Sequence, residues 1–502
     1  MTKPIVIIGA GYGGLAAAIR LRARGWPVHI VEAGPQPGGR GRVFQRDGHR
    51  FDAGPTVITA PYLLDELFAL LGRRLEDYAE LVPVDPFYRV RFSEGGHFDY
   101  VQDDERLLAQ IEAFNPRDVD GYQRMVKHSR RIFEIGYQQL ADVPFDSFTD
   151  MLRVAPDMLR LGNHRSVYGM VSSYIRDPRL RQVFTFQPLL IGGNPFNVSS
   201  IYLLIHWLER KWGVWFPKGG SYALIEAMVK LLGEVDVPVQ LNAPVEEILV
   251  EGGRATGVRL ADGTVIEASH VVSNADPTHT YKELIAPEHR RKHTDQRAGR
   301  VRQSMGLFVG YFGVEGDYND TLRHHEILLG PRYKELLHDI FDRRVLADDF
   351  SLYLHNPSRT DPSLAPAGRS SFYVLSPVPN QRSGLDWSEL GEAYFDKILG
   401  HLEDRLMPGL RGRITTRFHL TPRYFEESLR SPDGAGFGPE PTLTQSAWFR
   451  YHNRSEDVKS LFFVGAGTHP GAGVPGVITG AKVLDRIVPD PAERLDLPGM
   501  RG

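Results

Sequence analysis

The sequence predicts an α/β protein in which one Rossmann-like domain is assembled from distant parts of the chain. A strand, a glycine loop and a helix open the chain at residues 5–19, and a second unit of this kind closes it at 461–487. Between them, residues 237–274 alternate apolar and polar side chains around "EGG" and "ADG", which is typical of β-hairpins. Because long segments separate these three pieces, we expect a second domain to fill the gaps.

The opening unit has the pattern of a βαβ motif. Ile5–Ile8 is a short apolar run of the kind that forms a buried parallel strand. The helix that follows begins at the glycines and should end near Gly25, a residue type that commonly follows a helix C-terminus. Val28–Val31 then forms the second strand of the motif.

The glycine loop of this unit has the spacing Gly9-x-Gly11-x-x-Gly14. Such glycines allow a tight turn, close approach of the backbone to a pyrophosphate and close packing of the helix, whose N-terminus attracts phosphate. Glu32 ends the second strand, where its carboxylate can accept hydrogen bonds from a ribose and would repel a 2′-phosphate. The unit therefore predicts dinucleotide binding and argues against NADP. Its predicted cofactor contacts are Gly9, Gly11, Tyr12, Gly13, Gly14, Glu32 and Ala33.

The residues after this acid favour FAD over NAD. "PGGRGRVF" contains Gly39 and Arg40, and "FDAGPTVIT" places Gly54, Pro55 and Thr56 shortly afterwards. A nicotinamide cofactor gives no reason for this second loop. A longer cofactor does, because Arg40 can reach its phosphates while the turn at Gly54 and Pro55 lets the backbone approach an aromatic ring.

The composition excludes several classes of protein. A formal net charge of −3 rules out capture of nucleic acid by overall charge, and the absence of cysteine excludes disulfides, thiolate catalysis and cysteine-ligated metals. No apolar run reaches the ~18 residues that a membrane-spanning helix needs, and the apolar start is too short for a signal peptide. We therefore expect a cytoplasmic protein, or one bound peripherally to the cytoplasmic face of a membrane.

Motifs along the whole chain resemble the FAD-dependent flavoprotein family that includes amine oxidases, protoporphyrinogen oxidase and carotenoid desaturases. Within that family the chain is most similar to the bacterial and fungal-type phytoene desaturases. The resemblance covers residues 4–487, and its last motif is the most specific. The motifs are "FDAGPTVIT", "FNPRDVDGY", "GGNPFNVSSIY", "ERKWGVWFPKGG", "TQSAWFR" and "GAGTHPGAGVPGVI".

This resemblance implies a flavoprotein fold of the two-dinucleotide-binding-domain type, in which FAD reaches from the first glycine loop to the closing one. A mixed sheet-and-helix substrate domain would be interlaced with it. The implied FAD-binding domain comprises 1–80, 216–285 and 451–490, the substrate-binding and membrane-associating domain 81–215 and 286–450, and a tail 491–502. The tail after Val488 is expected to fray. The resemblance adds Val245, Asn274, Gly465, Gly467, Gly473, Val474 and Val477 to the cofactor contacts.

The implied activity is desaturation of 15-cis-phytoene through phytofluene, zeta-carotene and neurosporene to lycopene. Oxygen or a membrane quinone would accept the electrons. The alternatives are another carotenoid desaturase, isomerase or oxidase, an amine oxidase, or an isoprenoid carrier without enzymatic activity. Glu32, Arg40 and "GAGTHPG" argue against the carrier.

The sequence gives few candidates for acid–base chemistry. No side chain accepts hydride, so a cofactor must, and a polyene that delocalises positive charge does not require a strong base. Asp150 and Arg153 share a helix face, where they either steer charge and proton loss or form a solvated ion pair. His469 lies in the closing loop, where it either catalyses or shapes the loop. No metal site is predicted.

A forty-carbon hydrocarbon substrate would require contact with a membrane. Moving it through water costs on the order of 30 kcal/mol, at roughly 0.8 kcal/mol per methylene, so it must pass directly from the bilayer into the protein. Residues 201–216 are apolar and aromatic, and they form either a membrane contact or a core helix and tunnel wall. Residues 290–302 carry six basic side chains and one acid, and they bind anionic headgroups or form a solvated loop.

Overall fold

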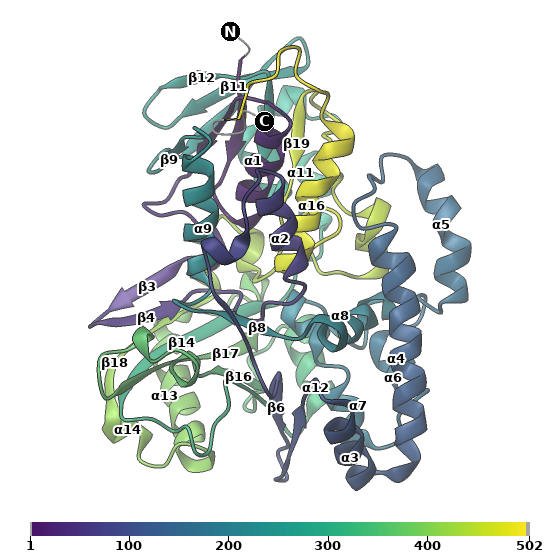
Figure 1. Ribbon diagram of the computed structural model, residues 1–502, viewed down its shortest axis with the longest axis vertical. Coiled ribbons are helices and arrows are strands. Elements are labelled where there is room, and N and C mark those ends of the chain that lie inside the picture. The colour runs from purple at the N-terminus through teal and green to yellow at the C-terminus, as the bar shows by residue number, and fades with distance from the viewer. Residues whose placement is uncertain (1–2, 498–502) are drawn as a thin grey trace.

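A five-stranded parallel sheet forms the centre of one of the two large parts of the fold. The computed structural model describes residues 3–497 and orders the strands β19-β13-β1-β2-β9. Figure 1 shows that the strands come from the beginning, middle and end of the chain. This sheet confirms the predicted α/β class. The strands are β1 (Ile5–Ile8), β2 (Val28–Val31), β9 (Val239–Gln240), β13 (His270–Ser273) and β19 (Leu461–Phe463).

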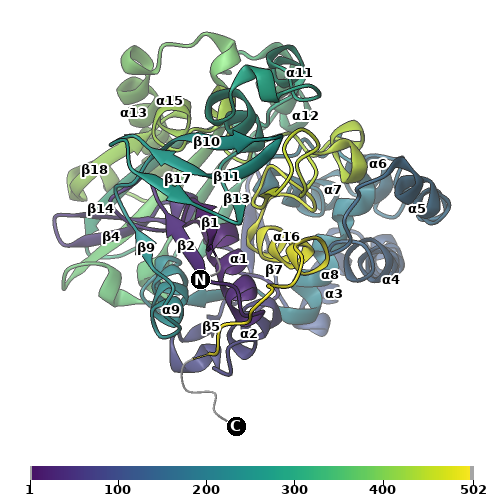
Figure 2. The same cartoon turned by 90° about the horizontal axis from the view of Figure 1, so that it is seen from above.

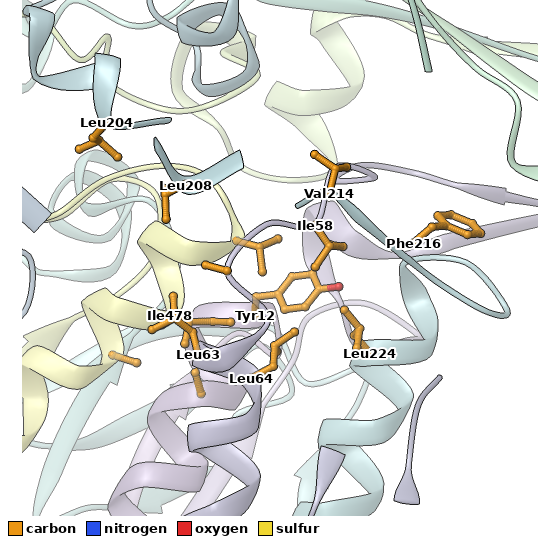
Figure 3. Packing of buried hydrophobic residues seen from close by; sticks show 14 of the residues in the cluster. Tyr12, Ile58, Leu63, Leu64, Leu204, Leu208, Val214, Phe216, Leu224 and Ile478 are labelled. Atoms are coloured by element: carbon orange, nitrogen blue, oxygen red, sulfur yellow. The ribbon is translucent and has the colours of Figure 1, made fainter. Parts of the chain in front are cut away.

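Helices from both ends of the chain pack together beside this sheet. Helix α1 (Tyr12–Ala23) lies against α16 (Val474–Ile487), as Figures 1 and 2 both show. The fully buried residues 15–19 of α1 include three alanines, whose small side chains allow this close approach. Figure 3 shows the ring of Tyr12 at the centre of the surrounding core. That core also draws on α2 (Tyr62–Ala69) and α9 (Tyr222–Gly233).

The middle of the alternating segment, residues 245–267, forms a small antiparallel sheet, as the hairpin pattern predicts, while its two ends supply β9 and β13 of the parallel sheet. The strands of the small sheet are β10 (Val245–Glu251), β11 (Arg254–Leu260) and β12 (Val265–Glu267), in that order.

A second large sheet of seven strands is mixed. Only β6 and β15 pair in parallel; the other neighbours are antiparallel. Along β17, Phe372 and Val374 enter a core with helix α13 (Trp387–Arg405), whereas Tyr373 and Leu375 face a cavity. The boundaries between the FAD-binding and substrate-binding domains stay a prediction. In sheet order the strands are β18 (Ile414–Leu420), β14 (Gly306–Glu315), β17 (Arg369–Val378), β16 (Leu352–His355), β15 (His325–Leu328), β6 (Tyr88–Arg91) and β7 (His97–Tyr100).

A helical arm flanks the cavity on the other side. Its helices are α3 (Asp104–Phe114), α4 (Val119–Phe133), α5 (Phe148–Arg160), α6 (Val167–Val171), α7 (Pro178–Val183) and α8 (Leu204–Trp212). Helix α5 lies at the outer edge of the molecule in both views (Figures 1 and 2) and contains no buried residue.

Short elements complete the chain. The helices are α10 (Pro277–His279), α11 (Asp295–Arg300), α12 (Tyr333–His338), α14 (Leu410–Arg413) and α15 (Pro422–Glu427). The strands form two pairs, β3 (Val43–Arg46) with β4 (His49–Asp52) and β5 (Leu81–Pro83) with β8 (Trp215–Pro217). No helix among residues 3–497 has the length and apolar character needed to cross a membrane.

The described part of the tail is tied down, so the prediction of fraying is wrong for it. Leu495 N–H donates to Gly25 O at 2.9 Å, and the Arg22 guanidinium donates to the carbonyls of Leu495 and Asp496 at 3.2 and 2.7 Å. These bonds fix the tail against the end of α1. Residues 498–502 lie outside the described part of the chain.

Candidate functional site

One large cavity connects the two glycine loops with the seven-stranded sheet and the helical arm. Its volume is about 1460 Å³. Of the cofactor contacts predicted from the sequence, all but Gly14 and Gly467 line it. Those two glycines serve packing instead. A Cβ on Gly14 would lie 2.0 Å from Gly9 O, and one on Gly467 would lie 2.3 Å from Pro277 Cδ.

Asn274 joins the first and last glycine loops. It follows β13, and its side chain lies where a Cβ on Gly11 would be 3.0 Å from Nδ2. A Cβ on Gly13 would lie 2.5 Å from Oδ1 of the same amide, and one on Gly465 would lie 2.8 Å from it. Glycine is therefore required at these positions by close approach, and the two loops form one continuous wall of the cavity.

Glu32 is built into this wall by the backbone. Its two carboxylate oxygens accept hydrogen bonds from the N–H groups of Ala10 and Gly34, both at 2.8 Å. A carboxylate has about four acceptor positions, so each oxygen keeps a lone pair for a hydroxyl donor in the cavity. The side chain is only 8% exposed, which fixes its direction. This arrangement fits a nucleotide ribose.

Arg40 lines the cavity without a carboxylate partner among residues 3–497. Nη2 donates to Ser431 Oγ at 2.9 Å, whereas Nε is buried and has no hydrogen-bond partner in the described chain. Burial lowers the pKa of this guanidinium, and the charge of Asp276 opposes that shift. A half-buried cation with an unpaired N–H is suited to an anionic phosphate. The residues present therefore fit FAD.

Arg450 and Asn453 fix the closing loop. The buried Arg450 guanidinium donates to the carbonyls of Thr468 and Ala466 at 3.0 and 2.6 Å, and burial lowers its pKa. Asn453 donates to His469 O at 3.1 Å. These bonds fix the conformation of the loop, whose residues Ala466, His469, Gly473, Val474 and Val477 line the cavity.

His469 lines the cavity and ties the closing loop to the helical arm. Its Nε2 lies 3.0 Å from Leu140 O, so the ring donates there. Burial lowers the pKa of His469 to about 4, which makes the neutral ring the working form at ordinary pH. The geometry supports the loop-shaping role of this residue.

Asp150 and Arg153 do not line the cavity. Asp150 caps α5, where its carboxylate accepts from Ser147 N–H at 3.2 Å, and it lies 3.7 Å from the Arg153 guanidinium. The Arg153 side chain is 80% exposed. The catalytic reading of this pair is therefore wrong, because the opposite face of α5, including Met151, Val154 and Met158, lines the cavity.

The sequence reasoning missed a polar patch on the cavity wall. Glu209 on α8 is fully buried; Tyr88 O–H donates to its Oε1 at 2.7 Å, while Oε2 has no partner among the described residues. Burial raises the pKa of Glu209 to about 8. Elsewhere on the wall of the same cavity, Thr56 Oγ1 lies 2.7 Å from Tyr353 Oη and 2.8 Å from Tyr373 Oη. The sequence feature that could have revealed Glu209 is its position as an acid inside the apolar segment 201–216.

Most of the remaining cavity wall is apolar. Residues 201–216 supply core and tunnel wall, as the second reading of that segment predicts. Apolar residues of this wall include Met158, Leu189, Ile201, Ile205, Leu208, Leu307, Val309 and Leu375.

The basic segment 290–302 is largely engaged within the protein. Three of its cations form ion pairs, Arg290 with Asp295, Lys292 with Glu456, and Arg302 with Asp342 and Glu440. The segment contains α11, so it is not a simple loop, and binding of anionic headgroups by its other basic residues stays a prediction.

Comparison with known proteins assigns the family. A model of the flavin-containing amine oxidoreductases matches residues 12–482. The chain belongs to this family. A phytoene desaturase (lycopene-forming) from Pseudescherichia vulneris is similar to it at 52% identity, over 96% of this chain and 98% of that protein. A phytoene desaturase (neurosporene-forming) from Rhodobacter capsulatus is 46% identical, over 97% and 94%.

Solved structures of this family share the fold. Wild-type putrescine oxidase bound to putrescine has a TM-score of 0.65 at 17% identity, covering 97% of this chain and all of the other. Family membership confirms the resemblance found in the sequence, the flavoprotein fold and the FAD cofactor. The protein is an FAD-dependent oxidoreductase of this flavoprotein family.

Proposed function

We propose that the protein is a phytoene desaturase that converts 15-cis-phytoene stepwise, through phytofluene, zeta-carotene and neurosporene, to lycopene. The observation that supports this most is the apolar cavity that runs from the glycine loops along α5 and α8. The relatives act on phytoene according to their names, and the more similar of the two cited is lycopene-forming. Oxygen or a membrane quinone is the proposed final electron acceptor.

The proposed cofactor contacts follow the cavity wall. Glu32 receives the ribose hydroxyls, Arg40 the phosphates, and the loop carrying Gly465, Gly473 and Val477 the flavin end. FAD supplies an acceptor for the hydride that leaves the hydrocarbon. The chain itself contributes orientation and the exclusion of water, because apolar side chains surround the space next to the closing loop.

We assign the second half of the reaction, loss of a proton from the neighbouring carbon, to Glu209. Glu209 is among the residues that line the cavity, and its Oε2 makes no hydrogen bond of good geometry within the described chain, so the ionised carboxylate can accept the proton. Tyr88 holds the other oxygen and thereby fixes the direction of the carboxylate. A pKa of about 8 suits this role, since a base is most effective when its pKa lies near the working pH.

The proposed membrane contact lies at α5. Phe148, Leu152 and Leu159 of this helix are 48%, 57% and 61% exposed, and Leu443 and Phe449 of the adjoining loop are both 45% exposed. Phe148 packs on Trp448, which joins the two segments. Leu159, Leu443 and Phe449 also line the cavity, so the exposed apolar surface continues into it. Such a surface lets a hydrocarbon pass from lipid to the interior without crossing water.

The test is incubation of the purified, FAD-loaded protein with phytoene in liposomes, followed by separation of the products. The proposal expects coloured polyenes with additional conjugated double bonds, ending at lycopene. Colourless product in the presence of bound FAD and intact substrate would refute it. Accumulation of neurosporene instead would keep the desaturase assignment and correct the end product.

A further inference from the structure

Three histidines form a buried cluster behind the polar patch of the cavity wall. His324, His325 and His355 are 3%, 0% and 0% exposed, and one ring nitrogen of each lies within 4.8 Å of one from each of the others. The cluster belongs to the seven-stranded sheet, where His325 on β15 pairs directly with His355 on β16. Neither the cofactor contacts nor the proposed base explains why three imidazoles are gathered in the core.

Hydrogen bonds connect this cluster to the cavity. Tyr353 Oη lies 2.6 Å from His325 Nδ1 and 2.7 Å from Thr56 Oγ1, and both Tyr353 and Thr56 line the cavity. Tyr88, the partner of Glu209, places its ring 5.8 Å from that of His325. The inner end of the cluster therefore adjoins the place where the proton is released.

Hydrogen bonds also lead from the cluster to the surface. His355 Nε2 lies 3.1 Å from His324 Nε2, and His324 Nδ1 lies 2.6 Å from Thr360 Oγ1. Thr360 is half-buried and follows the exposed Arg359. The series thus runs from the cavity wall to solvent through groups that can each both donate and accept a proton.

One gap interrupts the series. His325 Nε2 and His355 Nδ1 have no hydrogen-bond partner among residues 3–497, although their rings stack with centroids 5.4 Å apart. A proton relay through these rings requires one water molecule to bridge the two atoms. With a bridging water, every hydrogen bond of the path can form in two ways. In one arrangement each group donates toward the surface, and in the other each group donates toward the cavity.

We propose that Thr56, Tyr353, His325, His355, His324 and Thr360 conduct the proton of the reaction from the cavity to solvent. The inference rests on the proposed function. A proton received at Thr56 Oγ1 displaces the Thr56 proton to Tyr353 Oη, Tyr353 passes its own proton to His325 Nδ1, and each following group passes its own proton outward until Thr360 releases one to water. One proton enters the path and one leaves it, so no imidazole becomes a lasting cation. The hydrogen bonds of the path then reverse their direction before the next turnover.

The electrostatics of the cluster agree with this neutral route. Burial lowers the pKa of His324 to about 3, and it places the pKa values of His325 and His355 well below the usual range. The charge of Arg359 lowers that of His324 further. Because Glu209 is fully buried, its proton has no direct contact with solvent, and a path of this kind lets it ionise again.

The experiment compares first and later turnovers of FAD-loaded variants mixed rapidly with phytoene liposomes in air. His324→Gln and Thr360→Val interrupt the path without lining the cavity. Their first turnover should stay within about twofold of wild type, while later turnovers and proton release to an external indicator dye should slow at least ~10-fold. Thr360→Ser, which restores the hydroxyl, should recover the rate. His49→Gln is the control, since His49 is equally buried but outside the path.

Several outcomes would overturn the relay. Later turnovers at wild-type speed in both path variants would do so, as would an equal slowing of the first turnover, which would indicate damage to the site. If His324→Gln fails to fold, Thr360→Val and Thr360→Ser still decide. Stoichiometric bound metal that is lost in His355→Gln would replace the relay with a metal site. A wild-type protein with bound FAD and no product would overturn the proposed function, and the relay with it.

Discussion

Gly13 and Gly465, from opposite ends of the chain, are in backbone contact. A Cβ on Gly13 would lie 3.1 Å from both N and Cα of Gly465, and 2.5 Å from Asn274 Oδ1. The first and last glycine loops therefore meet directly at these two glycines, with the Asn274 amide packed against both. This contact explains why the chain returns at its end to the unit with which it began, since one extended cofactor needs both loops.

Gly13→Ala should force the two loops apart. We expect FAD affinity to fall at least ~10-fold, because the loops can no longer form one wall, while much of the sheet survives. Flavin content after purification and titration of the protein without cofactor measure this. Gly233→Ala is the matched control, since a Cβ there meets nothing within 4 Å at the end of α9. Equal FAD affinity in both variants would contradict the contact.

Arg40→Met should separate cofactor binding from folding. The guanidinium is a largely desolvated cation without an acidic partner among the described residues, so its removal should leave the stability of the cofactor-free protein unchanged or raised. FAD affinity should fall by about 2–3 kcal/mol, the size of a charge-assisted phosphate contact. Arg46→Met, at a 53% exposed side chain, is the control. Retained affinity in Arg40→Met would exclude the phosphate role.

Glu209→Gln should remove the pH dependence of the chemical step. With a pKa of about 8, the carboxyl of the wild-type protein is mostly protonated at neutral pH, so the first-turnover rate should rise with pH and level off above 8. The amide cannot accept the proton, so the variant should be slower by ~100-fold or more and insensitive to pH over this range. FAD content should not change. A variant that keeps the wild-type pH profile would remove Glu209 from the mechanism.

The same group should affect the stability of the cofactor-free protein. Its pKa is raised from 4.5 to about 8 on folding, so the native state holds a proton that the unfolded chain releases. This contribution to the free energy of unfolding is fully present below pH 4.5 and is lost as the pH rises to 8. Since one pKa unit corresponds to about 1.4 kcal/mol, the loss is on the order of a few kcal/mol. Glu209→Gln should therefore have the higher Tm at pH 9 and a similar Tm at pH 5; parallel curves would speak against this.

The exposed Leu152 of α5 should matter only when the substrate is in lipid. The variant Leu152→Ser, at a 57% exposed residue that does not line the cavity, should bind liposomes at least ~5-fold more weakly, because it removes an apolar side chain from the proposed contact. Conversion of detergent-dispersed phytoene should stay near wild type. Val345→Ser, at an exposed apolar residue outside α5, is the control. Equal liposome binding by the wild type, the α5 variant and Val345→Ser would show that the membrane contact is not at α5.

The sequence was sufficient for the elements with short-range signals. Ile5–Ile8 and Val28–Val31 form strands with the predicted bounds, because buried parallel strands are nearly continuous apolar runs. The spacing of the glycines also predicted the cavity wall. Where two backbones approach closely, only glycine fits, so the sequence carries a local signal. Gly14 and Gly467 are tightly packed and do not line the cavity, because packing and cofactor contact use the same residue type.

Local sequence patterns could not predict which distant strands pair or in which direction individual side chains point. The order of the seven-stranded sheet brings β6 beside β15 and thereby Tyr88 beside His325, which no local pattern encodes. Glu209 and Arg210 are neighbours in sequence, yet Glu209 is fully buried and accepts from Tyr88 O–H, while the Arg210 guanidinium pairs with the exposed Asp104. Helical periodicity alone does not say which of two adjacent charges points toward solvent.

The most direct test is to mix the FAD-loaded protein with phytoene liposomes without oxygen and follow the visible flavin band together with the polyene spectrum. The account predicts that the flavin bleaches as new conjugated double bonds form, one bound cofactor reduced for each double bond. New double bonds with an unbleached flavin, or a flavin that stays oxidised beside unchanged phytoene, would contradict it.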